Sequence, residues 1–202
     1  VLFLENYSVS VAEKIFPAAD VSEQISTASK EASGTGNMKF MMNGAVTIGT
    51  MDGANVEIRE EAGDDNIVIF GLTADQVMGY YQQGGYRPWE LYGQNQRIKQ
   101  AVDHLIDGTL PGHREEFRSI YSSLVDRDEF FVLKDFIDYA DAQIRINDLY
   151  RDNRRWNKMC LANIAHSGRF SSDRTISEYA IGIWKVDPVI IGDKNQVSDY
   201  HI

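Results

Sequence analysis

The sequence predicts an α/β protein in which helices cover a parallel sheet. Three short apolar runs rich in β-branched or aromatic residues indicate strands at Val1–Leu4, Ala45–Gly49 and Ile67–Phe70. A strand that is covered on both faces is apolar along its whole length. Segments with helical periodicity separate the three runs, and such alternation is typical of a parallel sheet.

Three helices are expected among these strands. Val9–Ile15 has apolar residues about one turn apart, and Pro17 ends it. Asn55–Ala62 is closed by Gly63, a residue type that suits a helix C-terminus. Thr73–Gln83 begins with threonine, a favourable N-cap.

The second half of the chain is expected to be mostly helical, so that strands and helices alternate over residues 1–85 and helices dominate residues 86–202. The predicted helices are Pro88–Asp107, Arg114–Leu124, Lys134–Arg151, Arg154–His166 and Ser172–Lys185. The last has an amphipathic stripe, with Ile176, Tyr179, Ala180, Ile183 and Trp184 on one face.

Composition excludes several classes of protein. The 202 residues carry 20 Lys plus Arg and 30 Asp plus Glu, a net charge of −10, which argues against a nucleic-acid surface. The single cysteine, Cys160, excludes an internal disulfide framework and is expected to be a buried structural thiol. No apolar run reaches transmembrane length, so we expect a cytoplasmic protein without a membrane partner.

The segment Glu31–Asn43 carries the most chemical information. Gly34 and Gly36 flank Thr35, so backbone N–H groups there can approach an anion closely. Lys39 follows within an apolar run, and a lysine in apolar surroundings becomes a better nucleophile towards an aldehyde. A phosphate-binding turn beside such a lysine is what pyridoxal phosphate requires.

The residues of this segment alone leave two main interpretations open. One is a glycine-rich loop before a buried helix whose lysine extends to water. The other is a pyridoxal phosphate site. A nucleotide-binding P-loop fails on spacing, because the four-residue gap and the Lys-Ser/Thr pair are absent.

Glu31–Asn43 resembles the cofactor-attachment segment of the α-glucan phosphorylases, the family of glycogen, starch and maltodextrin phosphorylases. Further stretches are similar to that family. They are Val1–Tyr7, Pro17–Asp20, Ser22–Thr27, Gly49–Glu57 and Gly168–Thr175. The similarity is close from Val1 to about Gly71, weakens in the middle and returns between Trp156 and Trp184.

The resemblance implies an architecture. The family has two Rossmann-like domains facing a cleft, the GT-B arrangement, and residues 1–202 are expected to be the later part of the second, cofactor-binding domain with its trailing helices. The sequence has no initiating methionine and opens on the predicted strand Val1–Leu4. We therefore expect a C-terminal portion of a longer protein.

The resemblance also implies site residues. Lys39 would bind pyridoxal 5'-phosphate as a Schiff base and be the catalytic residue of this chain. The cofactor-binding residues would be Lys39, Thr35, Gly36, Gly34, Tyr7 and Val9. The residues that contact a glucosyl unit would be Glu31, Ala32, Ser33 and Gly34.

Other residues are weaker candidates. Some family members have arginine at the position of Ser8, and serine cannot supply that charge to a phosphate. Asp52 is interpreted as a turn and helix-cap residue. The four histidines lack partners at metal-ligand spacing, so no metal is expected. They are His104, His113, His166 and His201.

The activity implied by the resemblance is phosphorolysis of α-1,4-glucan, with inorganic phosphate as second substrate and glucose 1-phosphate as product. The complete enzyme is expected to be a homodimer. Two phosphates in contact require several cations, and near Lys39 the sequence offers only Lys30, so we expect the isolated chain to be inactive. The alternative is a non-catalytic cofactor-binding or structural module; an aminotransferase would need an acidic partner and an arginine that are not evident.

Overall fold

The structure is a computed structural model that describes residues 2–111, 114–187 and 189. The chain divides into two compact units, residues 1–167 and 168–202. The first contains the sheet and all of the predicted site residues.

The sheet of the first unit has three parallel strands in the order β1-β2-β3. The strands are β1 (Val21–Gln24), β2 (Val46–Gly49) and β3 (Val68–Ile69). Helix α2 (Gly36–Met42) connects β1 to β2, and α3 (Asn55–Ala62) connects β2 to β3. These two successive βαβ units confirm the predicted α/β class with a parallel sheet.

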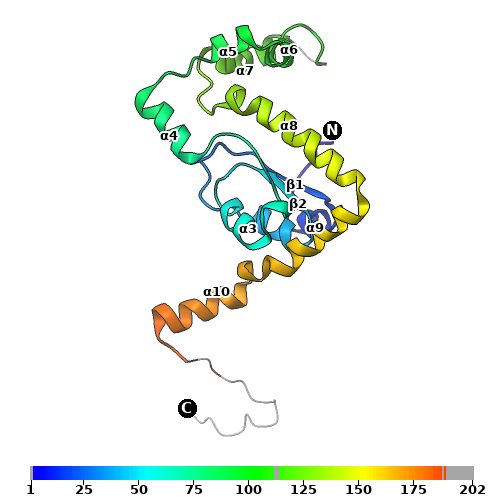
Figure 1. Ribbon diagram of the computed structural model, residues 1–202, viewed down its shortest axis with the longest axis vertical. Helices are drawn as coiled ribbons and strands as arrows, with labels where there is room; N and C mark the ends of the chain where they lie inside the picture. The colour runs from blue at the N-terminus through cyan, green and yellow to red at the C-terminus, as the bar shows by residue number, and fades with distance from the viewer. Residues whose placement is uncertain (1, 112–113, 188, 190–202) are drawn as a thin grey trace. The chain divides into compact units, whose positions relative to one another are not determined.

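Two long helices, α8 (Val132–Arg151) and α9 (Asn153–His166), complete the main core. In Figure 1 the strands lie between α8 and α3. All four residues of β2 are buried, as expected for a central parallel strand. The main core contains Val46, Ile48, Val68, Phe70, Ala142, Ile146, Leu149, Trp156 and Met159.

The remaining helices of the first unit extend from this core. They are α1 (Val9–Ile15), α4 (Ala74–Gln83), α5 (Pro88–Gln94), α6 (Gln96–Asp103) and α7 (Arg114–Asp126), with single 3₁₀ turns at Phe16–Ala18 and Asp64–Asn66. Helices α5, α6 and α7 gather beside the first turns of α8 (Figure 1). There Ile98, Val102 and Leu133 form a separate core cluster.

One predicted strand is absent from the structure, and one observed strand was not predicted. Val1 lies outside the described residues, and Leu2 and Phe3 are 83% and 88% exposed and form no strand. A strand requires a hydrogen-bonded neighbour, and no described strand pairs with this segment. The sequence pattern also missed β1, whose Val-Ser-Glu-Gln sequence is too polar to be recognised by an apolar run.

Most predicted helices are confirmed within two residues of their bounds. The exception in the first unit is Pro88–Asp107, which is interrupted at Asn95. The Asn95 side chain accepts hydrogen bonds from the N–H groups of Arg97 and Ile98 and so caps a new helix, α6. No helix in the described ranges combines the length and the apolar composition needed to cross a bilayer.

The second unit contains α10 (Ser172–Glu178), which continues as a π-helix over Tyr179–Trp184. The sequence predicted one amphipathic helix there, Ser172–Lys185. Three residues of its apolar stripe, Ile176, Ile183 and Trp184, are exposed, at 56%, 65% and 56%. Within this unit no other described element packs over that stripe, so local periodicity is not accompanied by burial.

Candidate functional site

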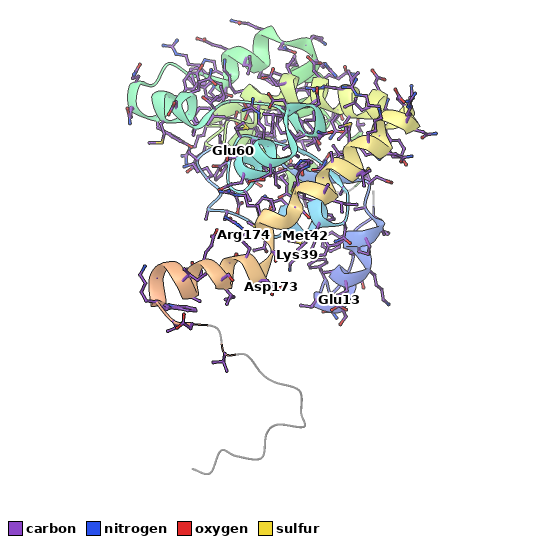
Figure 2. The ribbon with its side chains drawn as sticks, turned by 60° about the horizontal axis from the view of Figure 1, so that its bottom comes forward. Glu13, Lys39, Met42, Glu60, Asp173 and Arg174 are labelled. Atoms are coloured by element: carbon purple, nitrogen blue, oxygen red, sulfur yellow. The ribbon has the colours of Figure 1, made fainter. Side chains whose placement is uncertain are left out.

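Helices α1 and α2 line a cavity of about 750 Å³. One wall is formed by Gly36 and Lys39 of α2 and by Thr35, the N-cap residue just before it. The other wall comes from the N-terminal segment, α1 and the 3₁₀ turn that follows α1. That second wall consists of Tyr7, Ser8, Val9, Ala12, Glu13 and Phe16. Figure 2 labels Lys39 and Glu13, which belong to opposite walls. The volume lies in the range of small-molecule and cofactor sites, about 300–1,000 Å³.

The cavity brings together five of the six predicted cofactor-binding residues. Tyr7, Val9, Thr35, Gly36 and Lys39 all line it. Gly34 does not. Gly34 has φ +81°, and a Cβ there would lie 3.2 Å from Oδ1 of Asn37, so its requirement for glycine comes from the tight turn before α2.

Lys39 is exposed at the surface of α2, which differs from the expectation that it lies in apolar surroundings. The apolar run around Lys39 belongs to an amphipathic helix, and its buried residues are Asn37 and Met41. Lys39 therefore faces away from the core, and its ammonium group lies 5.7 Å from the centre of the Phe16 ring. The amine is thereby accessible to a ligand in the cavity.

Thr35 occupies the N-cap position of α2, and its carbonyl oxygen accepts the N–H of Lys39 at 3.2 Å. The Thr35 side chain makes no capping hydrogen bond. Its hydroxyl is therefore not required by the helix and is available to a ligand. The first N–H groups of any helix lack intrahelical backbone acceptors. In α2 the Met38 N–H donates to Oδ1 of Asn37, so the N–H groups of Gly36 and Asn37 are the donors that lie near the Lys39 amine.

The segment predicted to contact sugar lies beside this cavity rather than in its wall. Glu31, Ala32 and Ser33 are exposed, and Gly34 is half-buried. The Glu31 carboxylate accepts a hydrogen bond from the Ser26 hydroxyl at 3.0 Å. The four residues thus form an accessible loop directly before the helix that carries Lys39.

Asp52 has the turn role that the sequence predicted but does not cap a helix. Its carbonyl oxygen accepts the N–H of Asn55, as expected of a turn, but α3 begins after Ala54 without a side-chain cap. The Asp52 carboxylate instead accepts the backbone N–H groups of Lys30 and Glu31. This contact spans more than twenty residues, so no local sequence pattern could indicate it.

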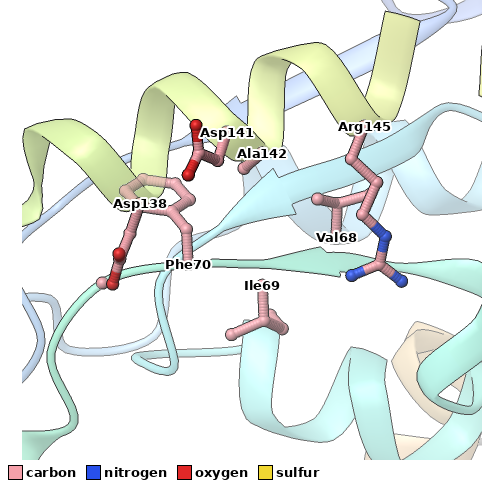
Figure 3. A pocket seen from close by; sticks show the side chains of 8 residues that line it. Val68, Ile69, Phe70, Asp138, Asp141, Ala142 and Arg145 are labelled. Atoms are coloured by element: carbon pink, nitrogen blue, oxygen red, sulfur yellow. The ribbon is translucent and has the colours of Figure 1, made fainter. Parts of the chain in front are cut away.

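A second cavity of about 410 Å³ lies between β3 and α8. Figure 3 shows Asp138 and Arg145 extending from α8 towards the level of β3, while Asp141 lies close to α8. Asp141 also pairs with Arg97 at 3.5 Å. This cavity shares no residue with the Lys39 cavity and contains no predicted site residue.

Comparison with known proteins identifies the family of this chain. A family model described as carbohydrate phosphorylase matches residues 1–186. The chain belongs to the carbohydrate phosphorylase family. This membership confirms the resemblance carried by Glu31–Asn43.

Individual phosphorylases are similar over nearly the whole chain. Glycogen phosphorylase of Bacillus subtilis is 62% identical over 94% of this chain and 24% of its own length. Glycogen phosphorylase of Synechocystis is 50% identical over 95% of the chain and 22% of its own length. The muscle form of human glycogen phosphorylase is 52% identical over 93% of the chain and 22% of its own length. This phosphorylase chain therefore spans about a quarter of these relatives.

Several lining residues of the phosphorylase chain were not predicted. Ala12, Glu13 and Phe16 join Val9 in the cavity wall. Ala12 and Glu13 lie three and four positions after Val9 on one face of α1, and Phe16 begins the 3₁₀ turn that follows. That spacing was visible in the sequence, but of this face only Val9 was expected at the cofactor site.

The other candidates have ordinary surroundings. His104 contacts the Asp107 carboxylate at 3.1 Å on the surface, and Nδ1 of His166 lies 2.8 Å from the Ala162 carbonyl oxygen. His113 and His201 lie outside the described residues. Cys160 is half-buried against the main core, and burial raises the pKa of its thiol. Across the described ranges, no group of three or more His, Cys, Asp or Glu has the arrangement of a metal site.

Proposed function

We propose that this chain is the cofactor-binding part of an α-1,4-glucan phosphorylase and that Lys39 binds pyridoxal 5'-phosphate. One observation carries the proposal: Tyr7, Val9, Thr35, Gly36 and Lys39 were predicted as cofactor-binding residues and line one cavity. The relatives at 50–62% identity are glycogen phosphorylases, which supports the same activity.

The residues present fit the cofactor. Tyr7 and Phe16 provide aromatic surface for a pyridine ring, and Lys39 provides an accessible primary amine. The Thr35 hydroxyl and the N–H groups of Gly36 and Asn37 provide donors for a phosphate. In this family the bound cofactor supplies proton transfer through its phosphate group beside the substrate phosphate.

In the proposed reaction Glu31, Ala32, Ser33 and Gly34 hold a glucosyl unit. The Glu31 carboxylate accepts hydrogen bonds from sugar hydroxyls, and the backbone N–H groups that follow donate to them. Because this loop leads directly into α2, sugar and cofactor are held by one continuous segment. Lys39 keeps the cofactor beside the sugar, which raises the effective concentration of the reacting groups.

Charge balance distinguishes this chain from a complete active site. Among the described residues that line the cavity, Lys39 alone is cationic. Two phosphates in contact need further positive charge, so we expect the purified 202-residue chain to release no glucose 1-phosphate from glycogen and phosphate. Measurable release would contradict this expectation. An aminotransferase would need an arginine for its substrate carboxylate, and the lining has none.

The wider assignments are part of the same proposal. They are a GT-B arrangement with residues 1–202 in its second domain, glucan and inorganic phosphate as substrates, a homodimeric complete enzyme and a cytoplasmic location. The parallel sheet and the family membership support the fold. The similarity to glycogen phosphorylases supports the substrates.

Cofactor attachment provides the test. The chain is incubated with pyridoxal 5'-phosphate, reduced with borohydride and digested, and the modified peptide is located by mass spectrometry. We expect modification at Lys39 and loss of the near-ultraviolet cofactor absorbance in Lys39→Ala. Lys158→Ala, which changes an exposed lysine of α9, serves as the control and should retain both signals.

The same experiment separates the alternatives. Attachment at Lys39 without turnover in any longer polypeptide would favour a non-catalytic cofactor-binding module. Equal attachment to Lys39 and Lys158 would show that reaction with aldehyde is unselective and would contradict the proposed site.

A further inference from the structure

The turn after β2 is attached to the loop that precedes α2 through Asp52. A single carboxylate oxygen, Oδ2 of Asp52, accepts two consecutive backbone N–H groups, from Lys30 at 3.0 Å and from Glu31 at 2.7 Å. Hydrogen bonds to an ionised acceptor are roughly twice as strong as neutral ones. Asp52 therefore fixes the backbone at the residue that begins the proposed sugar-binding segment.

The same turn holds both ends of the loop. The Thr50 hydroxyl donates to the Ser26 carbonyl oxygen at 2.6 Å, and the Ala54 N–H donates to the Ser33 carbonyl oxygen at 2.8 Å. Gly53 has φ +52°, and a Cβ there would lie 2.6 Å from that Ser33 oxygen. Such close approach is possible only for glycine, so the turn and the loop fit together without room for adjustment.

The Glu31 side chain is oriented by the loop itself. Its Oε2 accepts the Ser26 hydroxyl at 3.0 Å, while Oε1 accepts no hydrogen bond from the part of the chain that the structure describes. The carboxylate thus has one oxygen engaged by the protein, and its other oxygen is available to a ligand. Its position depends on the Glu31 backbone, which Asp52 holds.

We infer that Asp52 is a positioning residue for sugar recognition: it holds Lys30 and Glu31 so that Glu31 and the N–H groups of residues 32–34 meet a glucosyl unit in one fixed geometry. This inference rests on the proposed function. Recognition of adjacent hydroxyls requires groups held within about 0.5 Å, and a 1 Å displacement can lower a rate by about 100-fold. Asp52 lies outside the lining of the Lys39 cavity, so its removal should spare the cofactor.

The test uses the phosphorylase polypeptide that contains this chain, assayed in the synthesis direction with glycogen and glucose 1-phosphate. We expect Asp52→Ala to raise the KM for glucose 1-phosphate by about tenfold or more, with an unchanged pyridoxal phosphate content per chain. Asp52→Asn keeps an oxygen acceptor for both N–H groups and should lie within about threefold of wild type. Asp64→Asn, a change in an exposed carboxylate at the far end of α3, should have no effect.

Two results would overturn the inference. One is an unchanged KM in a folded Asp52→Ala protein. The other is a parallel fall in cofactor content, because Asp52 would then act on the cofactor site. If Asp52→Ala fails to fold, Asp52→Ser gives the decision: its shorter side chain cannot reach both N–H groups that Asp52 holds, so a wild-type KM in that folded variant also rejects the inference.

Failure of the proposed function has a different signature. A Lys39→Ala protein that retains the cofactor absorbance, or a wild-type polypeptide without phosphorylase activity, would reject the proposed function whatever the Asp52 variants do. Cofactor binding that depends on Lys39, combined with a wild-type KM in Asp52→Ala, would reject only the positioning role.

Discussion

The side-chain amide of Asn37 donates a hydrogen bond to Oδ1 of Asn55 at 3.1 Å, and this bond joins the first turn of α2 to the first turn of α3. The Asn55 amide in turn donates to the Thr50 carbonyl oxygen at 3.0 Å. Both asparagines are buried, at 2% and 3% exposure. The helix that carries Lys39 therefore begins at a position set by the end of β2 and the start of α3.

Replacing Asn55 should destabilise the protein. Asn55→Ala leaves the buried Asn37 amide without its partner, and an unsatisfied group costs about 1–3 kcal/mol. The Thr50 carbonyl oxygen loses one of two hydrogen bonds, because it still accepts the Asp52 N–H at 2.9 Å. We expect the free energy of unfolding to fall by about 1–3 kcal/mol in urea denaturation. Asn157→Ala, at an exposed position of α9, should change it by less than about 0.5 kcal/mol.

Substitutions at Gly49, and at Gly79 as a control, test the close packing around the Asn37–Asn55–Thr50 hydrogen bonds. A Cβ at Gly49 would lie 2.7 Å from Nδ2 of Asn55 and 2.8 Å from the Gln24 carbonyl oxygen, so Gly49→Ala should destabilise by about 1–3 kcal/mol. Gly79 lies in α4 with no atom within 4 Å of its Cβ position. Gly79→Ala should therefore stabilise by about 0.5–1 kcal/mol. Equal effects in thermal unfolding would contradict this view of Gly49.

Asp135 should make stability depend on pH. Burial raises the pKa of its carboxyl, as do the nearby charges of Asp138 and Asp128, while the Leu72 N–H and Lys134 oppose the shift. A folded pKa above the unfolded value means that the folded state binds more protons. Stability is then highest below the unfolded pKa and declines as pH rises through the folded pKa.

Urea unfolding at a series of pH values from about 4 to 7, starting near the ordinary Asp pKa, measures this decline. Asp135→Asn keeps an acceptor for the Leu72 N–H and removes the ionisation, so it should abolish the contribution of Asp135 to the slope. Asp148→Asn, on an exposed face of the same helix, should retain the wild-type slope. An unaltered slope in Asp135→Asn would show that other groups cause the pH dependence.

Ser8 offers a gain-of-function test of the cavity. Ser8 lines the cavity together with Thr35 and Lys39, so an arginine at position 8 adds a cation beside the proposed phosphate position. A hydrogen bond to a charged group is worth about 1.5–3 kcal/mol, which corresponds to a roughly tenfold or larger decrease in Kd. Absorbance titration of Ser8→Arg with pyridoxal 5'-phosphate measures it. Ser10→Arg, on α1 but outside the lining, should leave Kd unchanged.

Local sequence signals predicted much of the fold. The Thr73 hydroxyl accepts the Gln76 N–H and the Gln76 side chain accepts the Thr73 N–H, a complete capping box at the predicted start of α4. Strand β2 was predicted because its apolar run is buried on both faces. Such signals succeed because their partners are a few residues apart.

Strand β1 could not be predicted from local sequence signals. Its Glu23 carboxylate is held by Tyr139 and Gln143 of α8, more than one hundred residues away. Ser22 is 1% exposed although serine carries no signal for burial. A polar strand at this position is explained by partners that only the folded chain supplies.

The sequence by itself determined the family, the parallel α/β class and the motif that contains Lys39, because these depend on residue types and spacings along the chain. Only the tertiary structure decided that Ala12 and Glu13 of α1 join Val9 in the wall opposite Lys39 and that Asp52 holds Lys30 and Glu31 rather than capping α3. Helical periodicity identifies a face of α1 but not its partner, and a carboxylate can accept any N–H that the fold brings within reach. Such long-range pairings arise from how the strands and helices pack, which local patterns do not encode.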